Sequence, residues 1–180
     1  MSLTYERRAT DLSQTTVSER RGAALVWGLT RIVVGWMFLW AFLDKLFGLG
    51  YATPSERSWL NGGSPTRGFL ENSATGPFAD FYKDIAGQPW ADWLFMTGLL
   101  GIGIAMTLGI GMRIAGISAA VLYLMMWSVV LPPPNNPILD EHILGALVVI
   151  GLMLVHAGDT LGLGRMWSRL PIVQRTPWLR

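Results

Sequence analysis

The sequence predicts an all-α integral membrane protein built as a four-helix bundle. Hydrophobic residues make up 51% of its 180 residues, charged residues make up only 14%, and the mean hydropathy is +0.39. Soluble domains carry roughly a quarter charged residues. The apolar residues also gather in four blocks, each long enough to cross a bilayer core. These observations exclude an ordinary soluble domain, and the length allows a single domain.

The four apolar blocks are the expected membrane spans, and they lie at residues 23–47, 91–110, 114–131 and 138–157. As helices they would measure about 27–37 Å, which suits the hydrocarbon core of a bilayer. Short connections join the last three spans, so consecutive helices among them must be antiparallel neighbours. We therefore expect a membrane domain over residues 23–159.

The residues before the first span are polar, and we expect 1–22 to form a short, poorly ordered tail. The following apolar block begins only at Ala23 and is about 25 residues long, whereas a signal peptide has a shorter apolar region. The block is therefore interpreted as a retained first span.

The arginine distribution predicts the orientation. The two tails and the turn between spans two and three hold nine arginines, whereas the 42-residue connection 48–89 holds three cations. Because cytoplasmic segments carry the excess of Lys and Arg, both termini should face the cytoplasm and 48–89 should be external. A multi-pass protein of the plasma (inner) membrane follows. The arginines at the ends account for a pI near 9.3 without a nucleic-acid partner.

Two segments outside the spans have amphipathic patterns. In the external connection, Phe78, Phe81, Tyr82 and Ile85 recur at helical spacing behind Pro77, which predicts a short amphipathic helix. This connection is either a lid over the bundle or a plain surface connector. Residues 160–180 interleave tryptophan with arginine, which is typical of a basic, aromatic juxtamembrane tail lying on anionic inner-leaflet lipid.

The residue types present exclude several kinds of chemistry. There is no cysteine, so this chain can hold no disulfide, thiolate zinc site or cysteine-ligated iron–sulfur cluster. Its two histidines, His142 and His156, would lie about 21 Å apart on one helix, too far apart to ligate one haem iron. We predict no metal or haem bound by this chain alone.

Ionisable residues within spans are costly and therefore informative. Span four runs antiparallel to span one, and Arg31 is separated from Asp44 by about the same rise, ~20 Å, as His142 is from His156. Two polar layers are therefore expected. The outer layer would contain Asp44, Lys45, Asp140, Glu141 and His142, and the inner layer Arg31, His156 and Asp159.

The two layers have different interpretations. In the inner layer we expect a structural ion pair between Arg31 and Asp159. The outer layer combines a histidine, three carboxylates and a lysine, which could handle protons and hold an anion, or could merely end the helices at the interface. Trp36 and Trp40 lie on the same stripe as Asp44, and this aromatic wall is either core packing or a seat for a quinone.

The chain resembles the DoxX superfamily, and especially its DoxD-like branch, the large membrane subunit of thiosulfate:quinone oxidoreductase. The resemblance covers about residues 24–164. It rests on five segments in order: RIVVGWMFLWAFLDKLF at 31–47, GFLENSATGPFADFY at 68–82, DWLF at 92–95, NPILDEH at 136–142 and AGDTLGLG at 157–164.

The resemblance implies a four-helix subunit that passes electrons from thiosulfate, oxidised to tetrathionate, to quinone, with a smaller DoxA-like subunit as partner. By motif position, the family's residues map onto Arg31, Asp44, Lys45, Asn136, Asp140 and His142.

Two hypotheses about function follow. In the first, Asp44, Asp140, Glu141 and His142 are catalytic, Lys45, Asn136 and Arg67 bind the sulfur anion, and Trp36 and Trp40 bind the quinone. In the second, the chain is a non-catalytic DoxX-type subunit that anchors or organises a redox complex. Membrane lipid is a partner in both, and a second copy of the chain is a further candidate. A small-solute transporter is disfavoured, because neither a discontinuous span nor an inverted repeat is evident.

Overall fold

The computed structural model describes residues 2–180, with side chains from Ser18 onward. All regular secondary structure in this part of the chain is helical, and it contains no strand. The long helices are α1 (Ser2–Phe47), α4 (Pro89–Leu108), α5 (Met112–Val129) and α6 (Glu141–Leu154). Three segments are long and apolar enough to cross a membrane: Ser18–Phe47 of α1, α4 and α5. Their bounds match those of the first three predicted spans to within five residues.

The fourth apolar helix is shorter than expected. It was predicted over residues 138–157, but α6 contains 14 residues, which corresponds to about 21 Å of helix. Two polar groups explain the late start. Asn136 Oδ1 accepts hydrogen bonds from the amides of Ile138 and Leu139, and the Asp140 side chain then caps α6. At the other end, His156 has a φ of 51°, the left-handed conformation in which helices often end.

α1 begins well before the predicted span. Residues 2–22, expected as part of a polar tail, continue the helix, because α1 starts at Ser2. The physical reason is local, since residues 2–21 contain neither glycine nor proline and nothing interrupts the helix. Side chains of residues 1–17 lie outside the described part.

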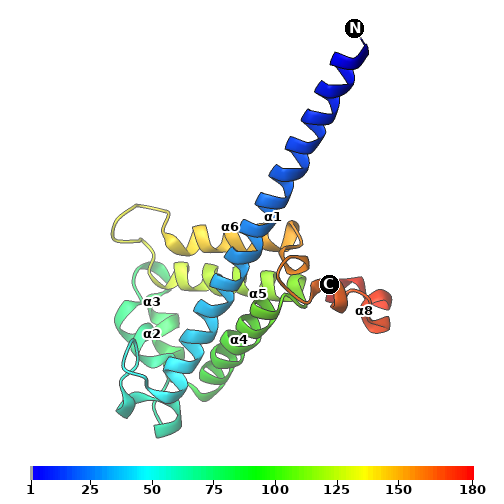
Figure 1. Cartoon of the computed structure of the whole chain (residues 1–180). Helices are drawn as coiled ribbons and strands as arrows, with labels where there is room; N and C mark the ends of the chain where they lie inside the picture. The colour runs from blue at the N-terminus through cyan, green and yellow to red at the C-terminus, as the bar shows by residue number, and fades with distance from the viewer. Residues whose placement is uncertain (1) are drawn as a thin grey trace.

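The helices pack in two pairs, α1 against α4 and α5 against α6, and the two pairs cross (Figure 1). Glycines allow the close approach of α1 and α4. A Cβ atom on Gly35 would lie 2.6 Å from the backbone nitrogen of Thr107, and one on Gly103 would lie 2.7 Å from Cγ of Leu39. The core between the pairs includes the fully buried side chains of Met96, Met106, Val149 and Leu152.

The connection between α1 and α4 folds against the C-terminal end of α5. It contains α2 (Arg67–Ser73), α3 (Ala79–Ile85) and the 3₁₀ turns η1 (Ser55–Arg57), η2 (Trp59–Asn61) and η3 (Gly76–Phe78). Leu70, Ala74 and Tyr82 form a small core with Val129 of α5. The predicted short amphipathic helix is confirmed as α3, although Phe78 and Phe81 of its expected apolar face are exposed.

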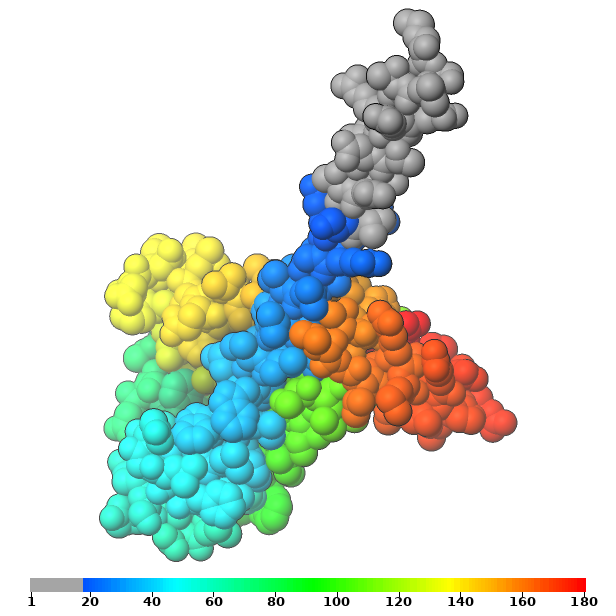
Figure 2. Space-filling view, in the orientation of Figure 1, coloured from blue at the N-terminus to red at the C-terminus, as the bar shows by residue number. Residues whose placement is uncertain are grey.

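The chain after α6 forms η4 (Ala157–Asp159), α7 (Gly164–Trp167), α8 (Pro171–Arg175) and η5 (Pro177–Leu179). Hydrogen bonds hold it at one end of the bundle. The Leu163 amide donates to the carbonyl of Leu108 over 2.8 Å, and the Arg113 amide donates to that of Arg180 over 2.9 Å. From this attachment the segment projects sideways, as the orange and red surface of Figure 2 shows.

Candidate functional site

Asp44 stabilises the turn that follows α1. Its side chain is 2% exposed, and its two carboxylate oxygens accept hydrogen bonds from the amides of Tyr51 and Ala52 over 3.2 and 3.0 Å. This carboxylate therefore acts as a local backbone clamp.

Asp140 and His142 form a polar pair at the first turn of α6. One carboxylate oxygen of Asp140 accepts from the His142 and Ile143 amides, and the other lies 2.7 Å from Nδ1 of His142. The imidazole is half-buried beside the Tyr123 ring at a centroid distance of 6.4 Å, whereas Glu141 is exposed. A carboxylate bonded to one ring nitrogen fixes the orientation of the histidine, and such a pair can take up and release a proton.

The structure does not bring Asp44 and His142 together. Figure 1 shows the C-terminal end of α1 and the N-terminal end of α6 well apart, and among residues 18–180 no hydrogen bond or ion pair joins the two groups. The predicted outer layer is therefore two separate groups. Equal depth on antiparallel helices fixes height but not lateral distance, and α1 packs along α4 while crossing α6.

The three residues expected to bind the sulfur anion are also dispersed. Lys45 is half-buried, with its ammonium 6.0 Å from the centre of the Phe95 ring. Arg67 is exposed and lies 3.6 Å from Glu71 in an ion pair. Asn136 Oδ1 accepts from two amides of the α5–α6 connection. Each of the three side chains makes its contacts separately, and none of them lines the cavity beside Asp159.

Trp36 and Trp40 form the predicted stripe on α1. Their ring centroids are 5.9 Å apart, and Trp40 meets Tyr51 edge-on at 5.1 Å. Trp36 is exposed on the apolar surface of the helix. The stripe continues toward the C-terminal end of α1 to the backbone clamp of Asp44, since Tyr51 belongs to both. Quinone binding by this stripe stays a prediction.

Arg31 is the most completely bonded side chain in the bundle. It has 0% exposure, and its guanidinium donates to five backbone carbonyls. Two acceptors end α4, and three lie beyond α6; they belong to Met106, Thr107, Ala157, Thr160 and Leu161. All five N–H groups of an arginine are thereby used. The negative end of the α4 dipole also favours a cation here.

The predicted ion pair between Arg31 and Asp159 is therefore wrong. Asp159 instead accepts from the Arg180 guanidinium at 3.3 Å. The guanidinium of Arg31 is satisfied by backbone carbonyls at the end of α4 and in the 157–161 turn, so it requires no carboxylate partner. Next to it, the hydroxyl oxygen of Thr107 is buried without a hydrogen-bond partner.

Asp92 is a buried carboxylate that sequence reasoning missed. One of its oxygens accepts from the Ser64 hydroxyl, the Thr66 hydroxyl and the Thr66 amide, over 2.8, 2.6 and 3.1 Å. The Thr66 hydroxyl oxygen in turn accepts from the Gly87 amide. This network ties the α1–α4 connection to the first turn of α4. The available signal was an acid in the first turn of an apolar span.

The end of the bundle that holds Asp159 contains a small cavity of about 20 Å³, room for about one water molecule. Its lining includes Arg113, His156, Asp159, Trp167 and Arg180. His156 is exposed, and the expected inner layer is thus divided between Arg31 in the core and Asp159 in this cavity. Within the described residues, no group of three His, Asp or Glu side chains could hold a metal ion.

These features define an α-helical protein with three helices suited to a membrane and several buried, internally bonded polar side chains. Comparisons of the chain with protein-family models, curated proteins and solved structures find no match.

Proposed function

We propose that the chain is a four-span subunit of the plasma membrane with both termini in the cytoplasm. The arginine distribution supports this orientation. Support for a fourth span comes from the residues flanking α6: Ile138 and Leu139 before it and Val155 after it are exposed and apolar, and they lengthen its apolar surface. The 131–140 connection and the 48–89 connection would then share the external face.

The function that the geometry supports best is that of a non-catalytic DoxX-type subunit, which anchors or organises a quinone-linked redox complex. The observation that carries it is the bonding of the buried charged side chains. The side chains of Arg31, Asp44 and Asp92 form their hydrogen bonds with groups of the same chain. Such residues hold the fold and leave little capacity for a substrate. The redox assignment itself rests on the DoxX resemblance.

The test is to delete the gene for this chain in its host and to measure how much DoxA-like subunit remains in the membrane fraction. A DoxA-like subunit should be lost from the membrane fraction, and thiosulfate-dependent quinone reduction should disappear with it. A His142→Ala variant should restore both, because a scaffold needs only assembly. A partner that stays bound to the membrane and active without this chain would overturn the proposal.

A second candidate function is catalysis, and the Asp140–His142 pair favours it. In the thiosulfate:quinone reaction, two thiosulfates form tetrathionate and release two electrons, while the quinone takes those electrons and two protons. A pair with a 2.7 Å hydrogen bond at a helix end could deliver these protons. The quinone would approach from the membrane along Trp36 and Trp40, with Lys45 and Arg67 as candidate anion contacts.

Conservative variants test this candidate. Asp140→Asn keeps a good capping residue at the start of α6 but removes the charge that pairs with His142. Under the catalytic hypothesis, Asp140→Asn and His142→Gln should lower turnover per assembled complex by about 10²–10⁴-fold, the usual range for a general acid or base. Glu56→Gln, at an exposed carboxylate that has no place in the hypothesis, is the matched control. Equal turnover in all three variants would exclude the pair from the reaction.

A further inference from the structure

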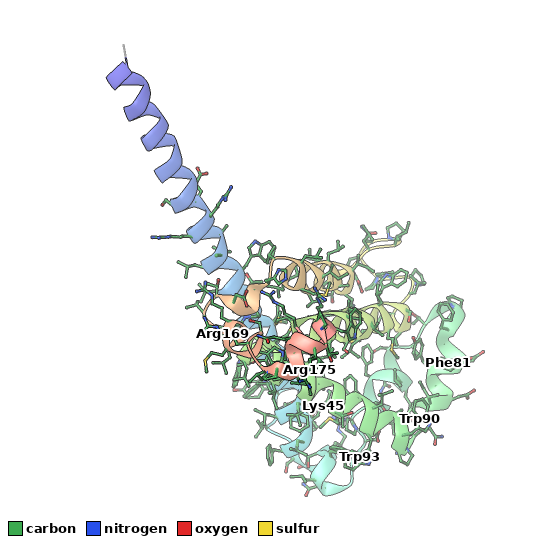
Figure 3. All side chains as sticks on the ribbon, turned by 90° about the vertical axis from the view of Figure 1, so that its right-hand side faces the viewer. Lys45, Phe81, Trp90, Trp93, Arg169 and Arg175 are labelled. Atoms are coloured by element: carbon green, nitrogen blue, oxygen red, sulfur yellow. The ribbon has the colours of Figure 1, made fainter. Side chains whose placement is uncertain are left out.

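The C-terminal segment 160–180 carries positive charge without any compensating acid of its own. It contains Arg165, Arg169, Arg175 and Arg180 and no Asp or Glu. Arg180 pairs with Asp159, whereas the other three arginines are exposed and form no ion pair with the described acidic side chains. Figure 3 labels Arg169 and Arg175 on this segment, well apart from Phe81, Trp90 and Trp93.

The same segment exposes large apolar side chains among its cations. Met166 and Ile172 are 67% and 62% exposed, and Leu170 and Trp178 are also exposed. A surface that is both apolar and basic is suited to the boundary between lipid headgroups and acyl chains, where tryptophan also accumulates. The surface of a soluble monomer rarely exposes several large apolar side chains within one short segment.

The bundle fixes the height of this segment. Leu163 is bonded to the last residue of α4, Arg113 at the start of α5 is bonded to Pro177 and Arg180, and η4 follows the end of α6. The segment therefore lies at the ends of three apolar helices, which is the level of the headgroups if these helices cross a bilayer. The Trp167 indole donates to the Leu179 carbonyl and closes the segment on itself.

We propose that residues 160–180 form a docking surface for anionic phospholipid headgroups in the leaflet beside them. Arg165, Arg169 and Arg175 supply the attraction, and the apolar side chains enter the boundary region. This inference rests on the membrane placement proposed above but not on the redox assignment. It gives the chain a lipid preference that the spans alone would not have.

The test uses the full chain, which has no native cysteine to interfere with labelling. Ile172→Cys is labelled with a polarity-sensitive fluorophore, and the protein is reconstituted in phosphatidylcholine vesicles with or without equimolar phosphatidylglycerol. The label should become shielded, and be quenched by brominated lipid, in the vesicles that contain phosphatidylglycerol. Added salt should reverse this change, because it screens exposed charges.

Arginine variants identify the source of the effect. Arg165→Gln, Arg169→Gln and Arg175→Gln should each lower the ratio of docked to free segment about five-fold, the equivalent of ~1 kcal/mol per cation near an anionic surface. Combined, they should abolish the lipid dependence. The control variant combines Arg20→Gln, Arg21→Gln and Arg57→Gln. It removes the same number of positive charges outside residues 160–180 and should leave the lipid dependence intact.

Three results would overturn the inference. The label could behave identically in both kinds of vesicle, or the combined tail variant could match the control variant. Shielding that follows the protein-to-lipid ratio, and not phosphatidylglycerol, would assign the surface to a second copy of the chain. Vesicle flotation separates this inference from the membrane placement, because a chain that floats with an unresponsive label contradicts only the lipid docking.

Discussion

Replacing Arg31 with lysine tests whether a single guanidinium joins α4 to the turn after α6. Lysine keeps the charge but offers three donors, whereas arginine uses five, so at least two backbone carbonyls lose their partner. An unpaired buried acceptor costs about 1–3 kcal/mol, and some of these carbonyls are only partly buried. We therefore expect Arg31→Lys to destabilise the protein by about 2–4 kcal/mol.

The assay is reversible unfolding in mixed detergent micelles, followed by helix circular dichroism. Arg31→Met, which removes all five guanidinium donors, should be more destabilising than Arg31→Lys. Arg21→Lys makes the same chemical change at an exposed position and should remain within about 0.5 kcal/mol of the wild type. The reasoning would be refuted if Arg31→Lys were as stable as Arg21→Lys.

Three further predictions concern the α1–α4 connection and the topology. Asp92→Asn should destabilise the protein by about 1–3 kcal/mol in the same unfolding assay, because charged acceptors make the stronger hydrogen bonds; wild-type stability would contradict this role. Tyr82→Phe removes the 2.6 Å contact with the Ser128 hydroxyl and should cost about 1 kcal/mol, with faster proteolysis of the connection; unchanged cleavage would count against it. Single cysteines at Thr75 and Arg21 should react with impermeant maleimide from opposite sides of the membrane, and labelling from one side would refute the topology.

The long helices were predictable because their signal is local. A run of apolar residues without charges marks a span wherever it occurs, and α4 and α5 follow this pattern closely. The end of a helix depends on individual capping groups, so the start of α6 was missed by three residues. Asn136 and Asp140 are candidate site residues by motif position. In the structure their side chains bond the amides before and at the start of α6 and so set where this helix begins.

The arrangement of the polar residues was less predictable. The acceptors of Arg31 are backbone carbonyls, which every residue carries, so no side chain in the sequence reveals them. A carboxylate such as Asp159 can be recognised in the sequence as a partner for an arginine, whereas a backbone carbonyl cannot. Similarly, matching depths predict that Asp44 meets His142, but α1 packs along α4, at Gly35 and Gly103, and not along α6, and a comparison of depths does not reveal this choice of neighbour.

We propose that this chain supports a redox complex and does not itself oxidise the substrate. The most direct measurement is thiosulfate-dependent reduction of a soluble quinone analogue by vesicles containing only this purified chain, beside vesicles to which the partner subunit is added. We expect no reduction above that of empty vesicles until a DoxA-like subunit is present. Sustained turnover by the chain alone, abolished in the Asp140→Asn variant, would contradict it.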